Sequence, residues 1–305
     1  MAKIVVTGGA GFIGSHVVER FIASGHDVMV VDNLSSGTRS NLFPRAQFHE
    51  IDIRSPEIRQ LLKEFAPDII VHTAAQMSVR MSMEDPTFDA DVNVVGLVNI
   101  LQSFEAHKLP FFVFLSTGGA IYGEQDFFPA TEDHPCRPTS IYGLAKRVGE
   151  MYLDFWSREL GLSYAALRLG NVYGPRQNPH GEAGVVAIFN KKLIAGETPT
   201  INGAGTQTRD FVYVRDVARA VEIVSTQGVK GIFNIGTGRE TSVNELYAMI
   251  TKALGKTTTA LYGDAKAGEQ MRSSIDATAA LNAFGWRPEV PLELGCQETS
   301  DWFRT

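Results

Sequence analysis

The chain has 305 residues, of which 44% are hydrophobic and 20% are charged, a composition typical of globular rather than disordered or fibrous proteins. A formal net charge of −6 argues against a general basic surface for nucleic acid or an anionic membrane. Two cysteines, Cys136 and Cys296, are too few for a disulfide scaffold, and no apolar run approaches the ~18 residues of a membrane span. We therefore expect a cytoplasmic protein without a signal peptide and without a nucleic-acid or membrane partner.

Strand-like and helix-like segments alternate along the first 170 residues. The strand-like segments are apolar on both faces, as in strands buried within a parallel sheet. They span residues 3–7, 27–32, 46–50, 68–73, 111–116 and 163–169, and the helix-like segments span 13–24, 56–66, 87–108 and 141–160. Such alternation predicts an α/β fold with a doubly wound parallel sheet that carries helices on both faces.

The alternation ends after residue 170. The next segment is rich in Gly, Pro, Asn and Gln around one helix-like stretch. A strand–helix–strand unit and two more helices are expected to complete the chain, so that the later elements span 185–195, 211–214, 215–226, 231–235, 243–254 and 277–284. We interpret residues 1–170 and about 209–236 as one domain. Residues 171–208 and 237–305 would form a smaller C-terminal lobe over the carboxyl edge of the sheet, where open α/β sheets bind ligands.

The first predicted strand leads into the turn Thr7-Gly8-Gly9-Ala10-Gly11-Phe12-Ile13-Gly14. Glycines spaced in this way permit a tight turn, close approach of the backbone to a pyrophosphate, and packing of the next helix on the strand. The N-terminus of that helix adds unpaired N–H groups and a partial positive charge. Strand, glycines, helix and second strand follow in the required order. The segment therefore predicts dinucleotide binding on a Rossmann-type sheet, with a purely structural turn as the alternative.

An aspartate ends the second predicted strand, eighteen residues after Gly14. The carboxylate of Asp32 could accept hydrogen bonds from both hydroxyls of an adenine ribose, and it would repel a 2′-phosphate. This favours NAD over NADP as the cofactor; an aspartate that only caps a turn is the alternative. Asp52 and Ile53 follow the third strand and are expected to contact the adenine.

Tyr142 and Lys146 are four residues apart on a predicted helix and therefore share one face of it. A lysine cation near a phenol stabilises the phenolate and lowers the tyrosine pKa from ~10. Such a tyrosine could take a proton from a substrate hydroxyl while hydride leaves the same carbon for NAD. The pair is unspecific alone, but its place just beyond the fifth strand of a dinucleotide fold favours a catalytic role.

Seven sequence blocks together resemble the extended short-chain dehydrogenase/reductase family, and within it the UDP-glucose (UDP-galactose) 4-epimerases. They are Thr7-Gly8-x-x-Gly11-x-x-Gly14, Asp32-Asn33-Leu34-Ser35-Ser36-Gly37, His72-Thr73-Ala74-Ala75-Gln76, Asn93-Val94-Val95-Gly96, Tyr142-x-x-x-Lys146, Asn171-Val172-Tyr173-Gly174-Pro175-Arg176 and Gln207-Thr208-Arg209-Asp210-Phe211. The resemblance extends over essentially the whole chain. It is specific for the family, but it does not specify the sugar.

The resemblance implies a set of NAD-binding positions and a second set that binds the nucleotide sugar. The NAD set is Gly8, Gly11, Phe12, Ile13, Gly14, Asp32, Asn33, Ser35, Ser36, Gly37, Asp52, Ile53, Ala74, Ala75, Gln76, Asn93, Ser116, Tyr142 and Lys146. The substrate set is Gly118, Tyr142, Asn171, Gln207, Arg209 and Arg272, in which the two arginines would hold the diphosphate because a guanidinium binds phosphate oxygens in pairs. Lys266 competes with Arg272 for this role, and a solvated charge at a helix end is the alternative for Arg272.

The chain departs from the family pattern at Gly118. Four residues before its Tyr-Gly pair, here Tyr122-Gly123, the family carries Ser or Thr, whose hydroxyl contacts the sugar 4-oxygen and relays its proton to the catalytic tyrosine. Three explanations are open: Tyr142 takes the proton directly, the neighbouring Thr117 replaces the missing hydroxyl, or catalysis is lost. We favour direct abstraction by Tyr142. Ser116 is expected only to face the nicotinamide.

Gly119 and Ala120 occupy the positions where the related sugar 4,6-dehydratases carry an Asp-Glu pair that eliminates water. The resemblance therefore implies reversible 4-epimerisation of a UDP-hexose through a 4-keto intermediate rather than elimination. A small residue, Ser273, stands where some epimerases carry a bulky Tyr, which would leave room for an N-acetyl group. No metal site is expected, because the seven histidines are scattered.

Two other functions stay open at this point. Epimerisation or decarboxylation of UDP-glucuronate would need a cation near the sugar C6, for which only Arg80 and Arg176 are candidates. A non-catalytic NAD-binding sensor on the same fold is the other. By resemblance, the chain is also expected to form a homodimer through helices 87–108 and 141–160.

Overall fold

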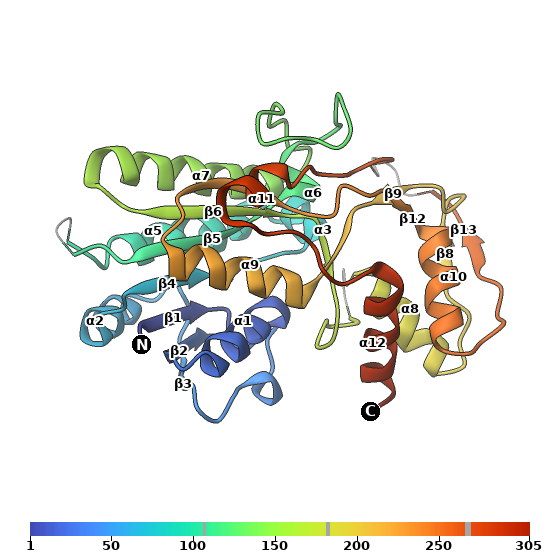
Figure 1. The fold of residues 1–305 in the computed structure, drawn as a ribbon, viewed down its shortest axis with the longest axis horizontal. Helices are drawn as coiled ribbons and strands as arrows, with labels where there is room; N and C mark the ends of the chain where they lie inside the picture. The colour runs from blue at the N-terminus through green and yellow to red at the C-terminus, as the bar shows by residue number, and fades with distance from the viewer. Residues whose placement is uncertain (106–107, 181–183, 266–269) are drawn as a thin grey trace.

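A seven-stranded sheet forms the centre of the larger part of the molecule, which is known here as a computed structural model that describes residues 1–105, 108–180, 184–265 and 270–305 (Figure 1). The strand order is β11-β6-β5-β4-β1-β2-β3, and all neighbouring pairs are parallel. The strands are β1 (Lys3–Thr7), β2 (Asp27–Asp32), β3 (Gln47–Glu50), β4 (Ile69–His72), β5 (Phe111–Thr117), β6 (Tyr164–Leu169) and β11 (Gly231–Ile235). The predicted doubly wound α/β fold is confirmed.

Helices cover both faces of this sheet because its strands, apart from the edge strand β3, are largely apolar on both faces. Along β1, Ile4 and Val6 pack into one core layer and Val5 packs into the other, as the alternation of side chains in a strand requires. The first layer is closed by α1 (Phe12–Ala23), α9 (Val214–Gln227) and α11 (Thr278–Phe284), and the second by α2 (Glu57–Phe65), α5 (Gly96–Leu101) and α7 (Ile141–Leu160).

The helix predicted over 87–108 differs from the prediction in its length and regularity. It consists of α4 (Pro86–Ala90), a π-helix (Asp91–Val95) and α5, which ends at Leu101. Residues 106–107 lie outside the described part of the chain. In the π-helix, the side-chain amide of Asn93 forms hydrogen bonds with the backbone N–H and the carbonyl of Gln76. The apolar periodicity of the segment does not predict this contact or the π-helix.

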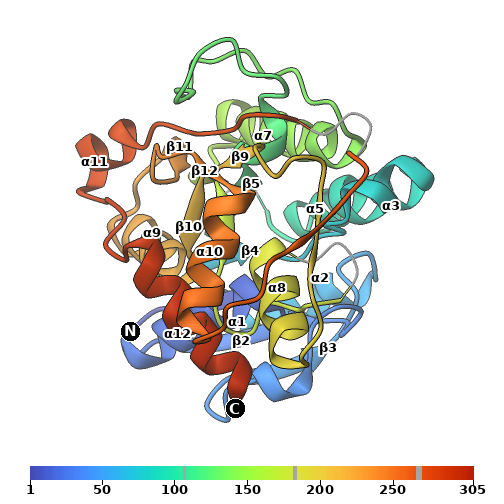
Figure 2. The same cartoon turned by 90° about the vertical axis from the view of Figure 1, so that its right-hand side faces the viewer.

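Among the described residues, three helices and three two-stranded sheets lie beside the carboxyl edge of the large sheet, and we refer to them as the C-terminal lobe (Figure 2). The helices α8 (Val185–Ile194), α10 (Val243–Ala253) and α12 (Leu292–Arg304) pack on one another around Phe189, Tyr247 and Cys296. The sheets pair β7 (Asn171–Tyr173) with β10 (Phe211–Tyr213), β8 (Thr200–Asn202) with β13 (Leu261–Gly263), and β9 (Thr208–Arg209) with β12 (Thr241–Ser242).

The expectation that helix 277–284 completes the chain is wrong, because α12 follows it. The buried face of α12 consists of Gly295, Cys296, Thr299 and Ser300, which are small or polar, so the segment lacks the apolar stripe that predicts a helix. The remaining short elements are a 3-10 turn (Arg39–Asn41), α3 (Val79–Glu84) and α6 (Gly118–Ile121). Among the described residues, no helix has the length and apolar character needed to cross a membrane.

Candidate functional site

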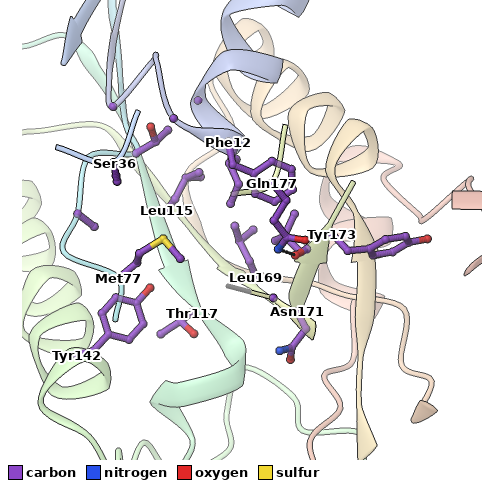
Figure 3. A pocket seen from close by; sticks show the side chains of 18 of the residues that line it. Phe12, Ser36, Met77, Leu115, Thr117, Tyr142, Leu169, Asn171, Tyr173 and Gln177 are labelled. Atoms are coloured by element: carbon purple, nitrogen blue, oxygen red, sulfur yellow. Dashed lines mark hydrogen bonds between the residues drawn. The ribbon is translucent and has the colours of Figure 1, made fainter. Parts of the chain in front are cut away.

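A cavity of about 600 Å³ lies between the carboxyl ends of the sheet strands and the C-terminal lobe. Its size is typical of pockets that hold a small molecule or cofactor. In Figure 3, Tyr142 and Thr117 lie on one side of this cavity, and Asn171 and Gln177 lie on the other. The residues from the predicted NAD set that line it are Gly8, Gly11, Phe12, Ile13, Gly14, Asp32, Asn33, Ser35, Ser36, Asp52, Ile53, Ala74, Ala75, Ser116, Tyr142 and Lys146.

The glycine turn brings three segments of backbone together at one end of the cavity. Gly8 has a φ of 72°, and a Cβ atom there would lie 2.6 Å from the backbone nitrogen of Ala74. A Cβ atom on Gly14 would lie 2.2 Å from the Gly8 carbonyl oxygen. Gly11 forms the N-cap of α1, and no side chain among the described residues caps this terminus. The first-turn N–H groups of α1 can therefore face an anionic ligand.

Asp32 lies at the end of β2 with both carboxylate oxygens engaged by the backbone. Oδ2 accepts a hydrogen bond from the N–H of Ala10 (3.0 Å), and Oδ1 accepts one from the N–H of Leu34 (2.8 Å). Burial raises the pKa of this carboxyl, and the two N–H donors oppose that effect. Because each carboxylate oxygen can accept more than one hydrogen bond, Asp32 retains acceptor capacity for hydroxyls in the cavity.

Asp52 also borders the cavity, but its carboxylate already accepts hydrogen bonds from two other side chains. Arg54 donates to both of its oxygens, and Asn33 Nδ2 donates to Oδ2 (2.8 Å). The hydrogen bonds from Arg54 hold the pKa of Asp52 below its usual range. Asp52 is therefore a fixed carboxylate that orients Asn33 at the rim of the cavity.

Gly37, Gln76 and Asn93 belong to the predicted NAD set but do not line the cavity. The amide of Asn93 bonds to the backbone N–H and carbonyl of Gln76, at 3.0 and 2.9 Å. Gly37 lies against the backbone of Ala10, where an added Cβ atom would come within 2.9 Å. The structure thus places these three residues behind the cavity wall, in contact with the segments that form it.

Tyr142 and Lys146 lie side by side on α7 at the cavity wall, as their spacing predicts. The Lys146 ammonium donates to the carbonyl of Leu115 (3.0 Å) and lies 5.9 Å from the centre of the Tyr142 ring. Burial raises the pKa of Tyr142 to about 12, with a further contribution from Asp89, and burial lowers the pKa of Lys146 to about 8. Burial alone therefore favours the neutral form of both groups, and the phenolate requires positive charge beside it.

Ser116 is tied into a buried ion pair. Its hydroxyl donates to Glu150 Oε1 (2.7 Å), and Glu150 also accepts two hydrogen bonds from Arg168 (2.9 and 2.7 Å). All three residues are at most 4% exposed. This network joins β5, β6 and α7 directly behind the Tyr142–Lys146 pair and holds Ser116 at the cavity wall.

Thr117 lines the cavity, whereas the adjacent Gly118 does not. The Thr117 hydroxyl accepts a hydrogen bond from the N–H of Ala120 (3.2 Å), and it can still donate its own hydrogen toward a ligand. A Cβ atom on Gly118 would lie 2.7 Å from Cδ1 of Ile275 and 3.2 Å from the carbonyl oxygen of Leu169. Ile275 therefore occupies the space that a side chain at position 118 would need.

Replacing Thr117 with valine tests whether this hydroxyl takes over the role expected at position 118. If Tyr142 accepts the substrate proton directly, the variant should keep kcat within about tenfold of the parent, because only a cap and one possible ligand contact are lost. Steady-state kinetics with the substrate proposed below measures this, with melting temperature recorded beside it. A drop of 10³-fold in a folded protein would instead assign the proton relay to Thr117.

On the lobe side, three predicted substrate residues, Asn171, Gln207 and Arg209, line the cavity. Gln207 Nε2 donates to the carbonyl of Asn202 (3.1 Å), and Arg209 donates to its neighbour's carbonyl (2.8 Å). These residues come from β7, the turn before β9, and β9, so the lobe sheets bring them to the cavity.

Arg272 does not line the cavity. Its guanidinium pairs with both oxygens of Glu240 (2.9 and 2.5 Å) and stacks on Phe128 with 3.9 Å between the guanidinium carbon and the ring centre. Lys266, its predicted competitor, lies outside the described residues. Ser273 is buried away from the cavity, so its small size leaves no extra room for a substituent there.

Sequence reasoning missed Gln177, which lines the cavity and is 9% exposed. Its Nε2 donates to the carbonyl of Val172 (3.0 Å), and Oε1 has no hydrogen-bond partner among the described residues. The amide cannot be reversed, because a carbonyl only accepts hydrogen bonds, so Oε1 is the atom left for a ligand N–H or O–H. No periodicity or glycine spacing marks this position; only its place six residues after Asn171 hints at it.

Comparison with known proteins gives one family and several close structures. Residues 4–236 match the model of the NAD dependent epimerase/dehydratase family. The chain is similar to the Thermotoga maritima UDP-glucose 4-epimerase solved with UDP-glucose (45% identity, TM-score 0.95, 99% and 98% of the two chains). It is also similar to the Thermus thermophilus UDP-glucose 4-epimerase in complex with NAD (40%, TM-score 0.93, 99% and 99%). A third similar structure is the UDP-N-acetylglucosamine 4-epimerase of Methanobrevibacter ruminantium with UDP-N-acetylmuramic acid (31%, TM-score 0.94, 99% and 98%).

Proposed function

The chain belongs to the NAD dependent epimerase/dehydratase family, and from this membership we propose that it interconverts UDP-galactose and UDP-glucose with tightly bound NAD. The observation that carries the proposal is the position of Tyr142 and Lys146. They lie at the wall of one cavity that extends from the glycine turn to the lobe residues Asn171, Gln207 and Arg209.

The residues that line the cavity are suited to binding NAD. The tight backbone approach at Gly8 and Gly14 leaves the start of α1 open to a pyrophosphate, and Asp32 keeps acceptor capacity for ribose hydroxyls. A 2′-phosphate would bring negative charge to a buried carboxylate, which favours NAD over NADP. When bound, NAD would supply the hydride acceptor for the sugar C4 and a positive charge beside the Tyr142 phenol.

In the proposed reaction, Tyr142 accepts the proton of the sugar 4-hydroxyl as the C4–H bond breaks, and a 4-keto sugar results. Lys146 stabilises the phenolate by its charge, and the carbonyl of Leu115 fixes the ammonium in place. Arg209 and Gln207 would hold the diphosphate while the ketone turns over about its link to it. Tyr142 then returns the proton after reduction on the opposite face of the sugar.

Two features of the cavity oppose the other reactions considered. Gly119 and Ala120 carry no acid or base, so the elimination of a 4,6-dehydratase lacks its residues. Arg80 pairs with Glu84, and Arg176 pairs with Glu19; neither lines the cavity, so neither is placed to bind a C6 carboxylate. Acceptance of UDP-N-acetylglucosamine rests only on the similarity to the epimerase of that substrate.

The direct test is incubation of the purified protein with UDP-galactose and detection of UDP-glucose without added NAD. UDP-N-acetylglucosamine and UDP-glucuronate are tested in parallel, and each reaction is repeated with NAD. Turnover of UDP-galactose supports the proposal. If turnover requires added NAD, the epimerase activity stands and only the tight binding of NAD is contradicted. No product from UDP-galactose under either condition overturns the proposal, and bound NAD without any turnover would then favour a sensor.

Arg209 lines the cavity and Arg272 does not, so we expect Arg209 to contribute more to the affinity for the substrate. Arg209→Met should raise the KM for UDP-galactose about tenfold or more, because it removes a charged donor from the cavity wall. Arg272→Met is the matched comparison and should have the smaller effect, since Arg272 is paired with Glu240 outside the lining. A larger KM increase for Arg272→Met would show that this arginine leaves Glu240 to bind the diphosphate.

We also propose that the protein acts as a homodimer. Five large apolar side chains are exposed on the π-helix and on α7, namely Val95, Leu144, Met151, Phe155 and Leu160. A helical surface of this kind is typical of an interface between subunits. The cytoplasmic location stays a prediction from composition; both cysteines are free thiols.

A further inference from the structure

A buried carboxylate that the proposed reaction does not use lies close to the Tyr142–Lys146 pair. Asp89, on α4, is 0% exposed. Its Oδ1 accepts hydrogen bonds from Gln76 Nε2 (2.8 Å) and Asn93 Nδ2 (3.0 Å). Its Oδ2 is buried and has no hydrogen-bond partner among the described residues. An unpartnered buried carboxylate oxygen is costly for the fold, so its presence calls for a function.

Asp89 holds two amides that fix the cavity wall. Asn93 binds the backbone of Gln76 on both sides, and Gln76 Oε1 accepts the N–H of Ser78 (2.5 Å). The segment locked in this way contains Ala74, Ala75 and Met77, which line the cavity. The family resemblance assigns Gln76 and Asn93 to NAD binding. In this structure, most of their side-chain hydrogen bonds are instead formed with Asp89 and with the backbone of residues 76 and 78.

Asp89 also acts electrostatically on both proposed catalytic groups. α4 packs against α7, and the negative charge of Asp89 raises the pKa of Tyr142 and of Lys146. Around Lys146, Glu150 on α7 adds negative charge, and His72 on β4 faces the ammonium. The other charged groups on elements packed against α4 are also paired: Asp91 with Arg54, and Arg80 with Glu84. On α7, Arg147 pairs with Glu150, and Arg158 pairs with Asp154 and Glu159.

We propose that Asp89 is a positioning residue of the reaction, which holds Gln76 and Asn93 behind the cavity wall and balances the charge of the Tyr142–Lys146 pair. The kinetic test of this proposal, the pH profile of kcat, rests on the proposed epimerase function. The spectroscopic test, titration of the Tyr142 phenol, does not depend on that function. Because the base must be ionised and Lys146 must be charged, the pH profile of kcat should have an acid limb and an alkaline limb, and both limbs report the coupled Tyr142–Lys146 pair.

The variant Asp89→Asn removes the charge and keeps the shape. Both limbs of the kcat profile should then move to lower pH, by about half a unit or more, since a lost negative charge stabilises the phenolate and destabilises the ammonium. Asn93→Ala is the control, because it breaks the same hydrogen-bond network without a change of charge. It should lower kcat and leave both limbs in place.

Unmoved limbs in Asp89→Asn, or limbs that move in opposite directions, overturn the proposal. Asp89→Ser supplies a second neutral variant if Asp89→Asn does not fold. The phenol is also titrated directly by tyrosinate absorbance in the NAD complex, with Tyr142→Phe subtracted. A lower Tyr142 pKa in the neutral variants supports the inference even if no UDP-sugar turns over, and an unchanged pKa contradicts it; absent turnover of the parent protein refutes only the proposed function.

Discussion

Replacing Tyr142 with phenylalanine is expected to lower the turnover of UDP-galactose by roughly 10²–10⁴-fold, the range of a lost general base. The variant removes one oxygen from a half-buried ring at the cavity wall and leaves the apolar contacts in place. The glycine turn and Asp32 lie elsewhere on the cavity wall, so NAD should stay bound. The measurement is single-turnover and steady-state kinetics, with NAD content determined by release on denaturation.

Tyr152→Phe provides the control for this substitution. Tyr152 lies on the same helix, outside the cavity lining, with its ring against Trp156. It should keep the parent kcat. Wild-type turnover in Tyr142→Phe would exclude this phenol as the base, and loss of NAD from the variant would show that its main role is cofactor binding.

Gly8→Ala should abolish NAD binding and destabilise the protein, the second large effect that the structure predicts. Two costs add at this position. The positive φ costs an alanine about 1–2 kcal/mol, and the overlap with Ala74 and Thr73 adds about 1–3 kcal/mol. Relief of the overlap requires β1 to separate from the segment after β4, which opens the site proposed for the pyrophosphate. Bound NAD and the urea unfolding midpoint measure the two consequences.

The matched control is Gly25→Ala. Gly25 has a φ of 81°, and a Cβ atom there would meet no atom within 4 Å. The same substitution therefore carries the backbone cost alone, and NAD content should not change. Equal losses of stability in the two variants would mean that the close approach at Gly8 is accommodated elsewhere.

Local rules were sufficient for the central sheet. Apart from the edge strand β3 (Gln47–Glu50), the sheet strands are short and largely apolar, and the glycine turn is formed by consecutive residues. Their positions along the chain therefore follow from the sequence. The Tyr142–Lys146 pair was predictable for the same reason, because four residues on a helix define one face. A helix with a small, polar buried face, such as α12, gives no such signal.

Contacts between distant segments could not be derived in this way. Asn93 and Gln76 are seventeen residues apart, and only the folded chain shows that they bind each other behind the cavity wall. Arg272 matches a sequence motif, yet its distance from the cavity depends on Glu240 and Phe128. The acceptor on Gln177 depends on one carbonyl that fixes its amide.

The close approach of Ile275 to Gly118 makes the effects of substitutions at these two positions depend on each other. A serine introduced at position 118 would collide with the end of the Ile275 side chain, so that step alone carries a stability penalty. A smaller residue at position 275 would remove this overlap, but it would leave a void until the hydroxyl arrived. The two positions are thus coupled as a pair, and each single change is less favourable than both together. This coupling tends to preserve the glycine, whichever group now handles the proton.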